Sequence, residues 1–270
     1  MLMAIDVGNT NMVFGLLEGE KLVGSFRLMT DANKTSDEIG LTVCEYFRRF
    51  NLDTDQVCDV IIASVVPQVM YTLTNAIMKY FGKRPLIIDD DISPEIHYEG
   101  DDHLGADRAV ACVAAMEKYG KPLVVLDFGT ATTVDAVDAH GTYLGGCILA
   151  GIRVSTDALF RQAAMLPRIE LINPGTVLGQ NTIQQIQAGS VLGYIGAAEY
   201  LIRRTKEELG YGQEIKVVAT GGLARLIADN TDLIDVVDSQ LIVDGLRIIY
   251  ERYREEQKRK KEAHKTTPCD

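Results

Sequence analysis

The sequence predicts an α/β fold made of two similar halves with mixed β-sheets flanked by helices. An apolar run that ends in Asp6–Gly8 near the start returns as a run that ends in Asp127–Gly129 in the middle of the chain. Each copy is followed by two further stretches with strand character that a tight turn connects. Beyond these hairpins, β-branched runs alternate with helical patterns, which is typical of α/β domains. A supersecondary unit that occurs twice indicates a duplicated domain.

The elements of the first half follow in a regular order. After the hairpin we expect a helix over Thr35–Phe50, because Thr35 is a suitable cap and acidic residues occupy the first turn. The β-branched run Val60–Val66 is typical of a buried strand, and Pro67 suits the first turn of a helix. The other elements expected here are the rest of that helix to about Tyr80, a strand at Pro85–Ile88, a loop over Asp89–His103 and a helix over Gly105–Tyr119.

The second half repeats the hairpin and continues with helices and one further strand. The elements expected are a helix from about Ile152, a loop over Pro167–Gly179, a long helix over Thr182–Leu209, a strand at Ile215–Ala219, a turn at Thr220–Gly222 and a last helix over Leu241–Glu256. We therefore expect an N-terminal domain over residues 1–120, a C-terminal domain over 121–258 and a disordered charged tail over 259–270. The apolar positions of the long helix either pack in the core or contact a second copy of the chain: Ile183, Ile186, Val191, Ile195 and Ala198.

The composition argues against several classes of protein. The formal net charge is −11 and the isoelectric point about 4.9, so the surface repels phosphates and we expect no nucleic-acid partner. We expect no membrane span, because no apolar stretch reaches the roughly 18 residues that a spanning helix needs. We also expect no signal peptide. The five cysteines form no C-x-x-C pair, which favours reduced thiols and a cytoplasmic location.

Each copy of the repeated turn combines residues that suit a phosphate and a cation. A carboxylate at a strand end, such as Asp6 or Asp127, offers the oxygen ligands that hard cations prefer. The glycine two residues later lets backbone N–H groups approach a phosphate, and Asn and Thr add donors. One copy alone is typical of an ordinary turn. Two copies facing each other would hold a nucleoside triphosphate from both sides.

Two further segments are candidates for ligand contacts. Gly105–Arg108 lies where a loop becomes a helix, so its N–H groups favour an anion, Arg108 could hold a carboxylate and Asp107 could take a proton from a hydroxyl. Taken alone, the segment is more typical of an acidic helix start. The turn that contains Gly221 and Gly222 has the geometry of a nucleoside or phosphate contact, although glycine pairs also make ordinary connections.

Four segments together resemble the type III pantothenate kinases of the acetate kinase, sugar kinase, Hsp70 and actin superfamily. They are Asp6–Asn11, Ser64–Pro67, Gly105–Arg108 and Asp127–Thr132, and they occur in the family's order over almost the whole chain. The resemblance implies two duplicated ribonuclease H-like (actin-like) domains with a cleft between them. One segment departs from the family pattern, because no Asn-Pro pair stands between Tyr98 and Gly105. The role of Tyr98 is therefore less defined than that of the other motif residues.

The resemblance also implies an activity, which is the ATP-dependent phosphorylation of pantothenate to 4′-phosphopantothenate, the first step of coenzyme A biosynthesis. The residues that would surround the ATP phosphates and Mg²⁺ are Asp6, Val7, Gly8, Asn9, Thr10, Asn11, Met12 and Val13. Thr130 would contact ATP, and Asp127 would bind a monovalent cation, K⁺ or NH₄⁺. Asp107 would be the general base. The residues that would hold pantothenate are Gly105, Ala106, Asp107 and Arg108, with Tyr98 and Thr182 completing the pocket across a homodimer interface.

Two other functions keep the repeated turns. Another small-molecule kinase of the superfamily would use a different acceptor pocket, and Gly105–Arg108 argues against it. A nucleotide-binding regulator related to accessory transcription factors would not need Asp107. The acidic isoelectric point and the missing DNA-binding motif argue against the regulator.

Overall fold

The computed structural model describes residues 1–98, 104–211 and 214–265, which form two compact units. Unit 1 comprises Met1–Glu95, Leu104–Ala114 and the chain from Ile242 onward. Unit 2 comprises the segment that begins at Ile96 and then Ala115–Leu241. This division differs from the expected domains, 1–120 and 121–258, because the last helix packs with the first unit. In the described part of the chain, no helix is long and apolar enough to span a membrane.

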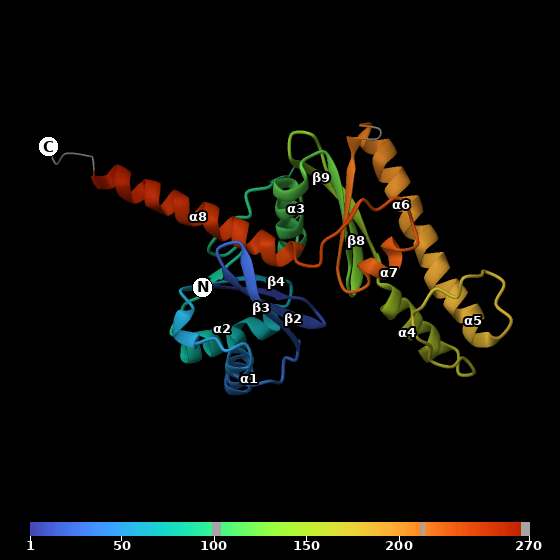
Figure 1. The fold of residues 1–270 in the computed structure, drawn as a ribbon, viewed down its shortest axis with the longest axis horizontal. Helices are drawn as coiled ribbons and strands as arrows, with labels where there is room; N and C mark the ends of the chain where they lie inside the picture. The colour runs from blue at the N-terminus through green and yellow to red at the C-terminus, as the bar shows by residue number, and fades with distance from the viewer. Residues whose placement is uncertain (99–103, 212–213, 266–270) are drawn as a thin grey trace. The chain divides into compact units, whose positions relative to one another are not determined.

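The sheet of unit 1 has five strands in the order β3-β2-β1-β4-β5. Strand β1 is antiparallel to β2 and parallel to β4. Helices α1 and α2 cover one face of this sheet, and α8 covers the other (Figure 1). The bounds are β1 (Leu2–Val7), β2 (Asn11–Glu18), β3 (Lys21–Met29), α1 (Ser36–Arg49), β4 (Asp59–Ser64), α2 (Pro67–Phe81), β5 (Leu86–Ile87) and α8 (Leu241–Lys265), with a 3₁₀ turn at Thr54–Gln56.

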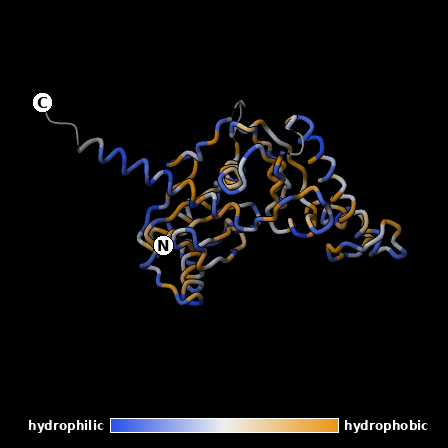
Figure 2. The backbone as a smooth tube through the Cα atoms, turned by 45° about the horizontal axis from the view of Figure 1, so that its top comes forward, coloured by the Kyte–Doolittle hydropathy of each residue, from blue (hydrophilic) through white to orange (hydrophobic). Residues whose placement is uncertain are grey.

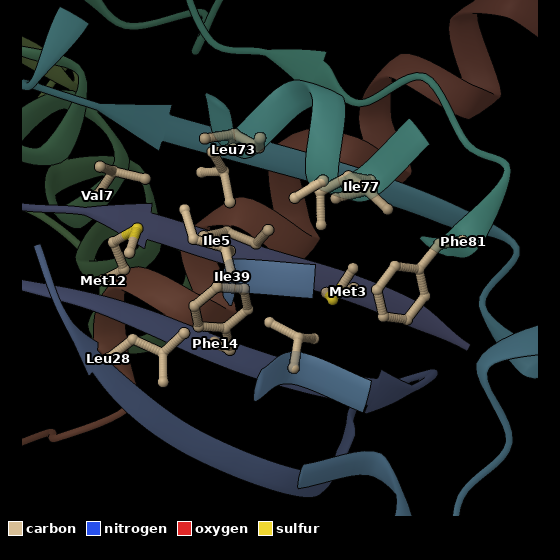
Figure 3. Packing of buried hydrophobic residues seen from close by; sticks show 14 of the residues in the cluster. Met3, Ile5, Val7, Met12, Phe14, Leu28, Ile39, Leu73, Ile77 and Phe81 are labelled. Carbon is tan, nitrogen blue, oxygen red and sulfur yellow. The ribbon is translucent and has the colours of Figure 1, made fainter. Parts of the chain in front are cut away.

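Every second side chain of β1 points into the core of unit 1. Met3, Ile5 and Val7 point to the same face, where Figure 3 shows them packed against Leu73 and Ile77 of α2. All five side chains are fully buried or nearly so. The residue between Ile5 and Val7 is Asp6, so the strand that anchors the core presents the candidate carboxylate on the opposite face.

Unit 2 repeats this topology. Its sheet has the order β11-β10-β7-β8-β9-β6, which matches the first sheet apart from β6 at the edge. Both hairpins even carry a register shift at the same place, between Leu16 and Leu17 in β2 and between Ala136 and Val137 in β8. The strands are β6 (His97–Tyr98), β7 (Leu123–Phe128), β8 (Ala131–Val137), β9 (Thr142–Ala150), β10 (Lys216–Thr220) and β11 (Val236–Val237). The expected duplicated α/β fold is confirmed.

The helices agree closely with the expected ones at both ends, apart from the end of α8. Thr35 caps α1 through a capping box with Glu38, and Pro67 opens α2. The expected long helix is one helical run that a π-helical segment, Ala188–Leu192, divides into α5 and α6. The remaining bounds are α3 (Ala106–Tyr119), α4 (Ile152–Gln162), α5 (Thr182–Gln187), α6 (Gly193–Leu209) and α7 (Ala224–Ala228).

Helix α8 is longer than the sequence pattern indicates. It continues to Lys265, whereas disorder was expected from residue 259, and residues 266–270 lie outside the described part. Ion pairs one turn apart support the extension: Arg259 with Glu255, and Lys260 with Glu256. Residues 254–262 of the helix are mostly exposed, and this part of the tube is mostly blue in Figure 2, so the apolar periodicity used to detect helices ends before the helix does.

A buried carboxylate in unit 2 connects the end of α3 to the segment before α8. Lys118 and Tyr119 donate hydrogen bonds to Asp238 Oδ2 at 2.6 and 2.7 Å, and the Gln240 N–H donates to its Oδ1 at 2.9 Å. Burial raises the pKa of Asp238, but these hydrogen bonds outweigh it and hold the pKa below its ordinary value. The carboxylate therefore stabilises the fold only while it is charged.

We expect Asp238→Asn to destabilise the protein in a pH-dependent way. At pH 7 the loss should be about 1–3 kcal/mol, the usual range for hydrogen bonds to a charged group. Because the folded-state pKa is lowered, the contribution of Asp238 is complete above the ordinary aspartate pKa of about 3.9 and is lost as the pH falls through the folded-state value. Urea unfolding of both proteins between pH 7 and pH 3 measures this difference. A difference that stays constant down to pH 3 would contradict it.

Candidate functional site

The first turn is tied to the end of the neighbouring strand. The Gly8 N–H donates to the Asn11 carbonyl at 3.0 Å, which closes the turn. Thr30, just after β3, donates from Oγ1 to the Gly8 carbonyl at 2.7 Å and from N–H to the Thr10 carbonyl at 3.0 Å. Asn9, Thr10 and Asn11 are exposed. Hydrogen bonds from Thr30 thus fix the main chain of the turn, while the side chains of the turn are exposed to solvent.

Burial limits which motif residues can use their side chains on a ligand. Val7 and Met12 are fully buried in the core of unit 1, so they can offer a ligand only main-chain groups. Asp6, Gly8 and Val13 are half-buried. The predicted nucleotide contacts therefore divide into side-chain contacts at the turn and main-chain contacts along its flanking strands.

Three motif segments meet inside unit 1. The Val65 N–H donates to the Val7 carbonyl at 3.1 Å, which joins the end of β4 to the first turn. Ser64 Oγ accepts from the Val66 N–H at 3.1 Å and shapes this connection. A Cβ placed on Gly105 would lie 4.0 Å from Val65 Cγ1, so the start of α3 lies against the same connection. Segments far apart in the sequence thus converge on the first turn.

The start of α3 places a carboxyl group close to its own backbone. Asp107 Oδ1 accepts from the Arg108 N–H at 2.8 Å, and a Cβ on Gly105 would lie 2.9 Å from that oxygen. Asp107 and Arg108 are half-buried, whereas Ala106 is almost fully buried and contributes to packing. The absence of a side chain at Gly105 therefore leaves Asp107 room for its carboxyl group.

The second turn is tied to its sheet as the first is, but it is one residue shorter. The Gly129 N–H donates to the Ala131 carbonyl at 3.0 Å, and the Gly151 N–H donates to the Thr130 carbonyl at 2.9 Å, as Thr30 does to Thr10. A Cβ on Gly151 would collide with the Gly129 and Thr130 carbonyls. Thr130 is exposed.

Gly221 packs against the main chain of the same site. Its φ of +94° is in the left-handed region, and a Cβ there would overlap Asp127 Oδ1 and lie 2.6 Å from the Phe128 nitrogen. A Cβ on Gly222 would meet nothing within 4 Å. The structure therefore brings Asp127, Thr130 and Gly221 together in unit 2, and it distinguishes the two glycines that the sequence presented as a pair.

The neighbours of the two strand-end acids differ. Asp127 lies opposite Thr133 of β8 and Thr220 of β10, so all three side chains lie on one face of the sheet. Asp6 in the corresponding place has Val13 and Ala63 as neighbours. Neither Thr133 nor Thr220 is assigned to the site from the sequence alone, because the face that each shares with Asp127 follows from the register of the strands.

The hydroxyl of Thr133 lacks a hydrogen-bond partner within the described residues although its oxygen is buried. Such an atom needs a ligand or water, because an unpaired buried hydroxyl is costly. In the described residues no group of three or more His, Cys, Asp or Glu gathers to hold a metal ion. A cation at Asp127 would thus draw on hydroxyl oxygens such as that of Thr133, which suits a weakly charged hard ion.

The two remaining candidates lie elsewhere in unit 2. Tyr98 lies in β6, and its ring meets that of Tyr143 edge-on with centroids 5.3 Å apart. Thr182 is the exposed first residue of α5, after Asn181, which caps the helix. It lines a hollow of about 550 Å³ between α4, the π-helical segment and α6. Neither residue belongs to the cluster at Asp127.

Comparisons with known proteins agree with this arrangement. A candidate Baf family transcriptional activator from Campylobacter jejuni is 20% identical, with 94% of this chain and 99% of that chain covered and a TM-score of 0.61. A candidate 2-dehydro-3-deoxygalactonokinase from Sinorhizobium meliloti is 11% identical, with 93% and 96% covered and a TM-score of 0.60. An activator of 2-hydroxyisocaproyl-CoA dehydratase from Clostridium difficile, solved with bound ADPNP, is 14% identical, with 100% and 99% covered and a TM-score of 0.52.

These likenesses show that the fold is that of the actin-like kinases and ATPases, as the sequence predicted. The sequence model of the type III pantothenate kinase family matches residues 2–204, which include the two turns, the start of α3 and Thr182. Because this match covers most of the chain, the chain belongs to the type III pantothenate kinase family, a family of kinases.

Proposed function

We propose that this chain transfers the γ-phosphoryl group of ATP to the hydroxyl group of pantothenate. The observation that carries the proposal is the convergence in unit 1, where Val65 joins the first turn to the start of α3. This contact brings a phosphate-binding type of turn and a half-buried acid, Asp107, into one framework. Together with family membership, it favours phosphoryl transfer to an alcohol over nucleotide binding alone.

Each candidate residue has a proposed role in phosphoryl transfer that suits its chemistry. Asp107 accepts the proton of the attacking hydroxyl, and Arg108 holds the pantothenate carboxylate. In each unit the N–H groups of the turn are suited to phosphate oxygens, and Asp6 would hold Mg²⁺, which supplies charge neutralisation when bound. The chain has no Gly-Lys-Ser/Thr sequence, and neither turn contains a lysine. Bound cations must therefore supply the positive charge that neutralises the phosphates.

ATP consumption measured with and without pantothenate tests the proposal. Consumption that depends on pantothenate and yields phosphopantothenate by mass spectrometry is the expected result. If a sugar or polyphosphate supports ATP consumption and pantothenate does not, pantothenate is not the acceptor and another kinase activity is favoured. ATP binding without consumption in the presence of either acceptor would favour the regulatory alternative. The cytoplasmic location stays a prediction.

We expect activity to need K⁺ or NH₄⁺ in addition to Mg²⁺. Asp127 and the Thr133 hydroxyl, which has no hydrogen-bond partner in the described part of the chain, support a monovalent site in unit 2. Replacing K⁺ by tetramethylammonium at equal ionic strength should abolish most turnover, because general screening is the same in both buffers. Thr133→Val should raise the K⁺ concentration for half-maximal activity roughly 5-fold, as the loss of about 1 kcal/mol requires.

Thr42→Val is the control, because Thr42 is a half-buried threonine of α1 in the other unit, where its hydroxyl donates to the Glu38 carbonyl. It should leave the K⁺ dependence unchanged. Full turnover in tetramethylammonium, or an unaltered K⁺ response in Thr133→Val, would count against the site.

We also propose a homodimer, but the structural support for it differs from the apolar periodicity of the long helix on which the expectation from the sequence rests. Of the five apolar positions of the long helix, four are buried within unit 2, and Ile183 alone is exposed. Their periodicity therefore reflects core packing. Large apolar side chains are nevertheless exposed in the loop before α5 and beside it, which is typical of an interface. They are Met165, Ile172, Val177, Leu178 and Ile183.

We expect the acceptor site to be completed by a second copy through Thr182, which directly precedes the exposed Ile183 at the start of α5. A closed two-fold dimer is the commonest assembly of this kind. Mixing Asp107→Asn chains with Thr182→Val chains should restore part of the activity, because mixed dimers contain one site with both native residues. Activity per chain should also fall on dilution. An active monomer at assay concentration by light scattering would refute the arrangement.

A further inference from the structure

The second sheet carries a strand that interrupts the duplication. Within the described residues, strand β6 lies at the edge of β9 and pairs with it at two positions, His97 with Thr142 and Tyr98 with Tyr143. The described part of the first sheet ends at β3 instead. A two-residue strand has few backbone hydrogen bonds of its own, so side chains must help to fix it.

The residues beneath this extra strand also depart from the duplication. In the first hairpin Gly15 lies opposite Ser25, and Leu17 lies opposite Leu22. In the second hairpin the corresponding pairs are Asp135 with Gly146, and Val137 with Tyr143. An acid thus replaces a glycine, and a tyrosine replaces a leucine. The two polar residues, Asp135 and Tyr143, contact each other through their polar groups.

Asp135 and Tyr143 form a buried polar pair. Tyr143 donates from its hydroxyl to Asp135 Oδ1 at 2.9 Å, and both residues are less than 5% exposed, at 3% and 1%. Burying a carboxyl group and a phenol costs free energy that an apolar pair would not, and the first hairpin forms the same bulged pairing with Gly15 and Leu22. The fold of the hairpin therefore does not require this polar pair, and its role lies in what the pair contacts.

The ring of Tyr143 contacts one of the candidate site residues directly. It meets the ring of Tyr98 at a centroid distance of 5.3 Å and an angle of 65°, the edge-to-face geometry that aromatic pairs prefer. The same two residues are paired through their backbones. With its hydroxyl held by Asp135, the ring of Tyr143 is fixed at one end and supports Tyr98 at the other.

We propose that the Asp135–Tyr143 pair positions β6 and Tyr98 for recognition of the acceptor alcohol. Both are positioning residues, because they act through Tyr98. The proposal rests on the proposed function, in which Tyr98 contributes to the acceptor pocket, and it extends the site to two residues inside the sheet. It also gives a reason why the second hairpin carries polar groups where the first carries none.

Steady-state kinetics of Tyr143→Leu test the proposal, because leucine is the residue at the matching position of the first hairpin. The KM for pantothenate should rise roughly 10-fold or more, as expected when a binding group is displaced by a fraction of an ångström to 1 Å. The kcat and the KM for ATP should stay within about 2-fold of the native values. Asp135→Asn should retain a KM near the native value, because its amide oxygen still accepts from Tyr143.

Tyr119→Phe is the matched control, since it also removes a hydrogen bond from a phenol to a buried aspartate of unit 2, Asp238. It should leave the KM for pantothenate unchanged. Equal rises in the KM for pantothenate and for ATP, or no change in either for Tyr143→Leu, would overturn the proposal. A loss of kcat alone would overturn it as well.

Hydrogen exchange provides a readout that does not depend on the substrate. The amides of Ile96–Tyr98 should exchange faster in Tyr143→Leu than in the native chain or Tyr119→Phe. Unchanged exchange would overturn the positioning role, whatever the substrate. If the native chain phosphorylates no pantothenate, the proposed function fails and the recognition of pantothenate by Tyr98 fails with it, while faster exchange would still support the positioning of β6.

Discussion

Asp107→Asn should lower kcat by roughly 10²–10⁴-fold, the range typical of a lost general base. The amide keeps the size of the side chain and can still accept from the Arg108 N–H, so α3 should begin at the same residue. ATP binding should persist, because the turns at Gly8 and Gly129 do not depend on this side chain. Stopped-flow or coupled assays give kcat, and titration calorimetry gives the affinity for ATP.

Asp37→Asn is the control for this variant. Asp37 is the second residue of α1, as Asp107 is of α3, so both substitutions remove one charge from a helix start. That charge is worth about 0.3–1 kcal/mol of stability in either helix. Asp37→Asn also weakens the contacts of Asp37 with Lys79 and Tyr80, so it should lower stability at least as much as Asp107→Asn does, and yet retain full turnover. An Asp107→Asn protein with native kcat would remove Asp107 from the reaction.

Gly221→Ala should both destabilise unit 2 and reduce activity strongly. The new Cβ overlaps Asp127 Oδ1 and lies 2.6 Å from the Phe128 nitrogen, so the strand-end acid must move. Overpacking of this kind costs about 1–3 kcal/mol, and a non-glycine residue at positive φ adds about 1–2 kcal/mol. Thermal unfolding should show a lowered midpoint, and turnover should fall because Asp127 and the second turn are displaced.

Gly222→Ala tests whether this effect comes from the contact with Asp127. A Cβ on Gly222 meets no atom within 4 Å, and Gly222 is not at positive φ. This neighbouring variant should have near-native stability and turnover. If both variants were equally impaired, the turn as a whole and not the Asp127 contact would be the cause. If both were native, the site would tolerate displacement.

The sequence predicts most of the framework of the site because local signals coincide with it. Strand-end acids followed by glycine mark both turns, and β-branched runs mark β4 and β10. Capping residues such as Thr35 and Pro67 define helix starts, since they act on their own backbone. These features depend on short stretches of chain, so they can be inferred without tertiary contacts.

Other parts of the site depend on contacts between distant residues. Strands β6 and β11 have two residues each, which is too short for alternation to be detected. The pairing of Thr133 with Asp127 needs the register of the hairpin, and the burial of Met12 needs the core of unit 1. The helical extension of α8 depends on ion pairs between turns, which an apolar pattern does not report.

The way the chain passes between the units has a consequence for its synthesis. Unit 1 contains both the segment that begins at Met1 and helix α8 from Ile242 onward, where Val243 packs on Gly15 and Tyr250 donates to Asp59. A ribosome adds about 5–20 residues per second. Because α8 follows unit 2 in the sequence, one face of the sheet of unit 1 stays uncovered until the residues of unit 2 have been synthesised. During that interval the nascent chain exposes the apolar surface that α8 covers in the folded protein, and a chain released before Ile242 would keep that surface exposed.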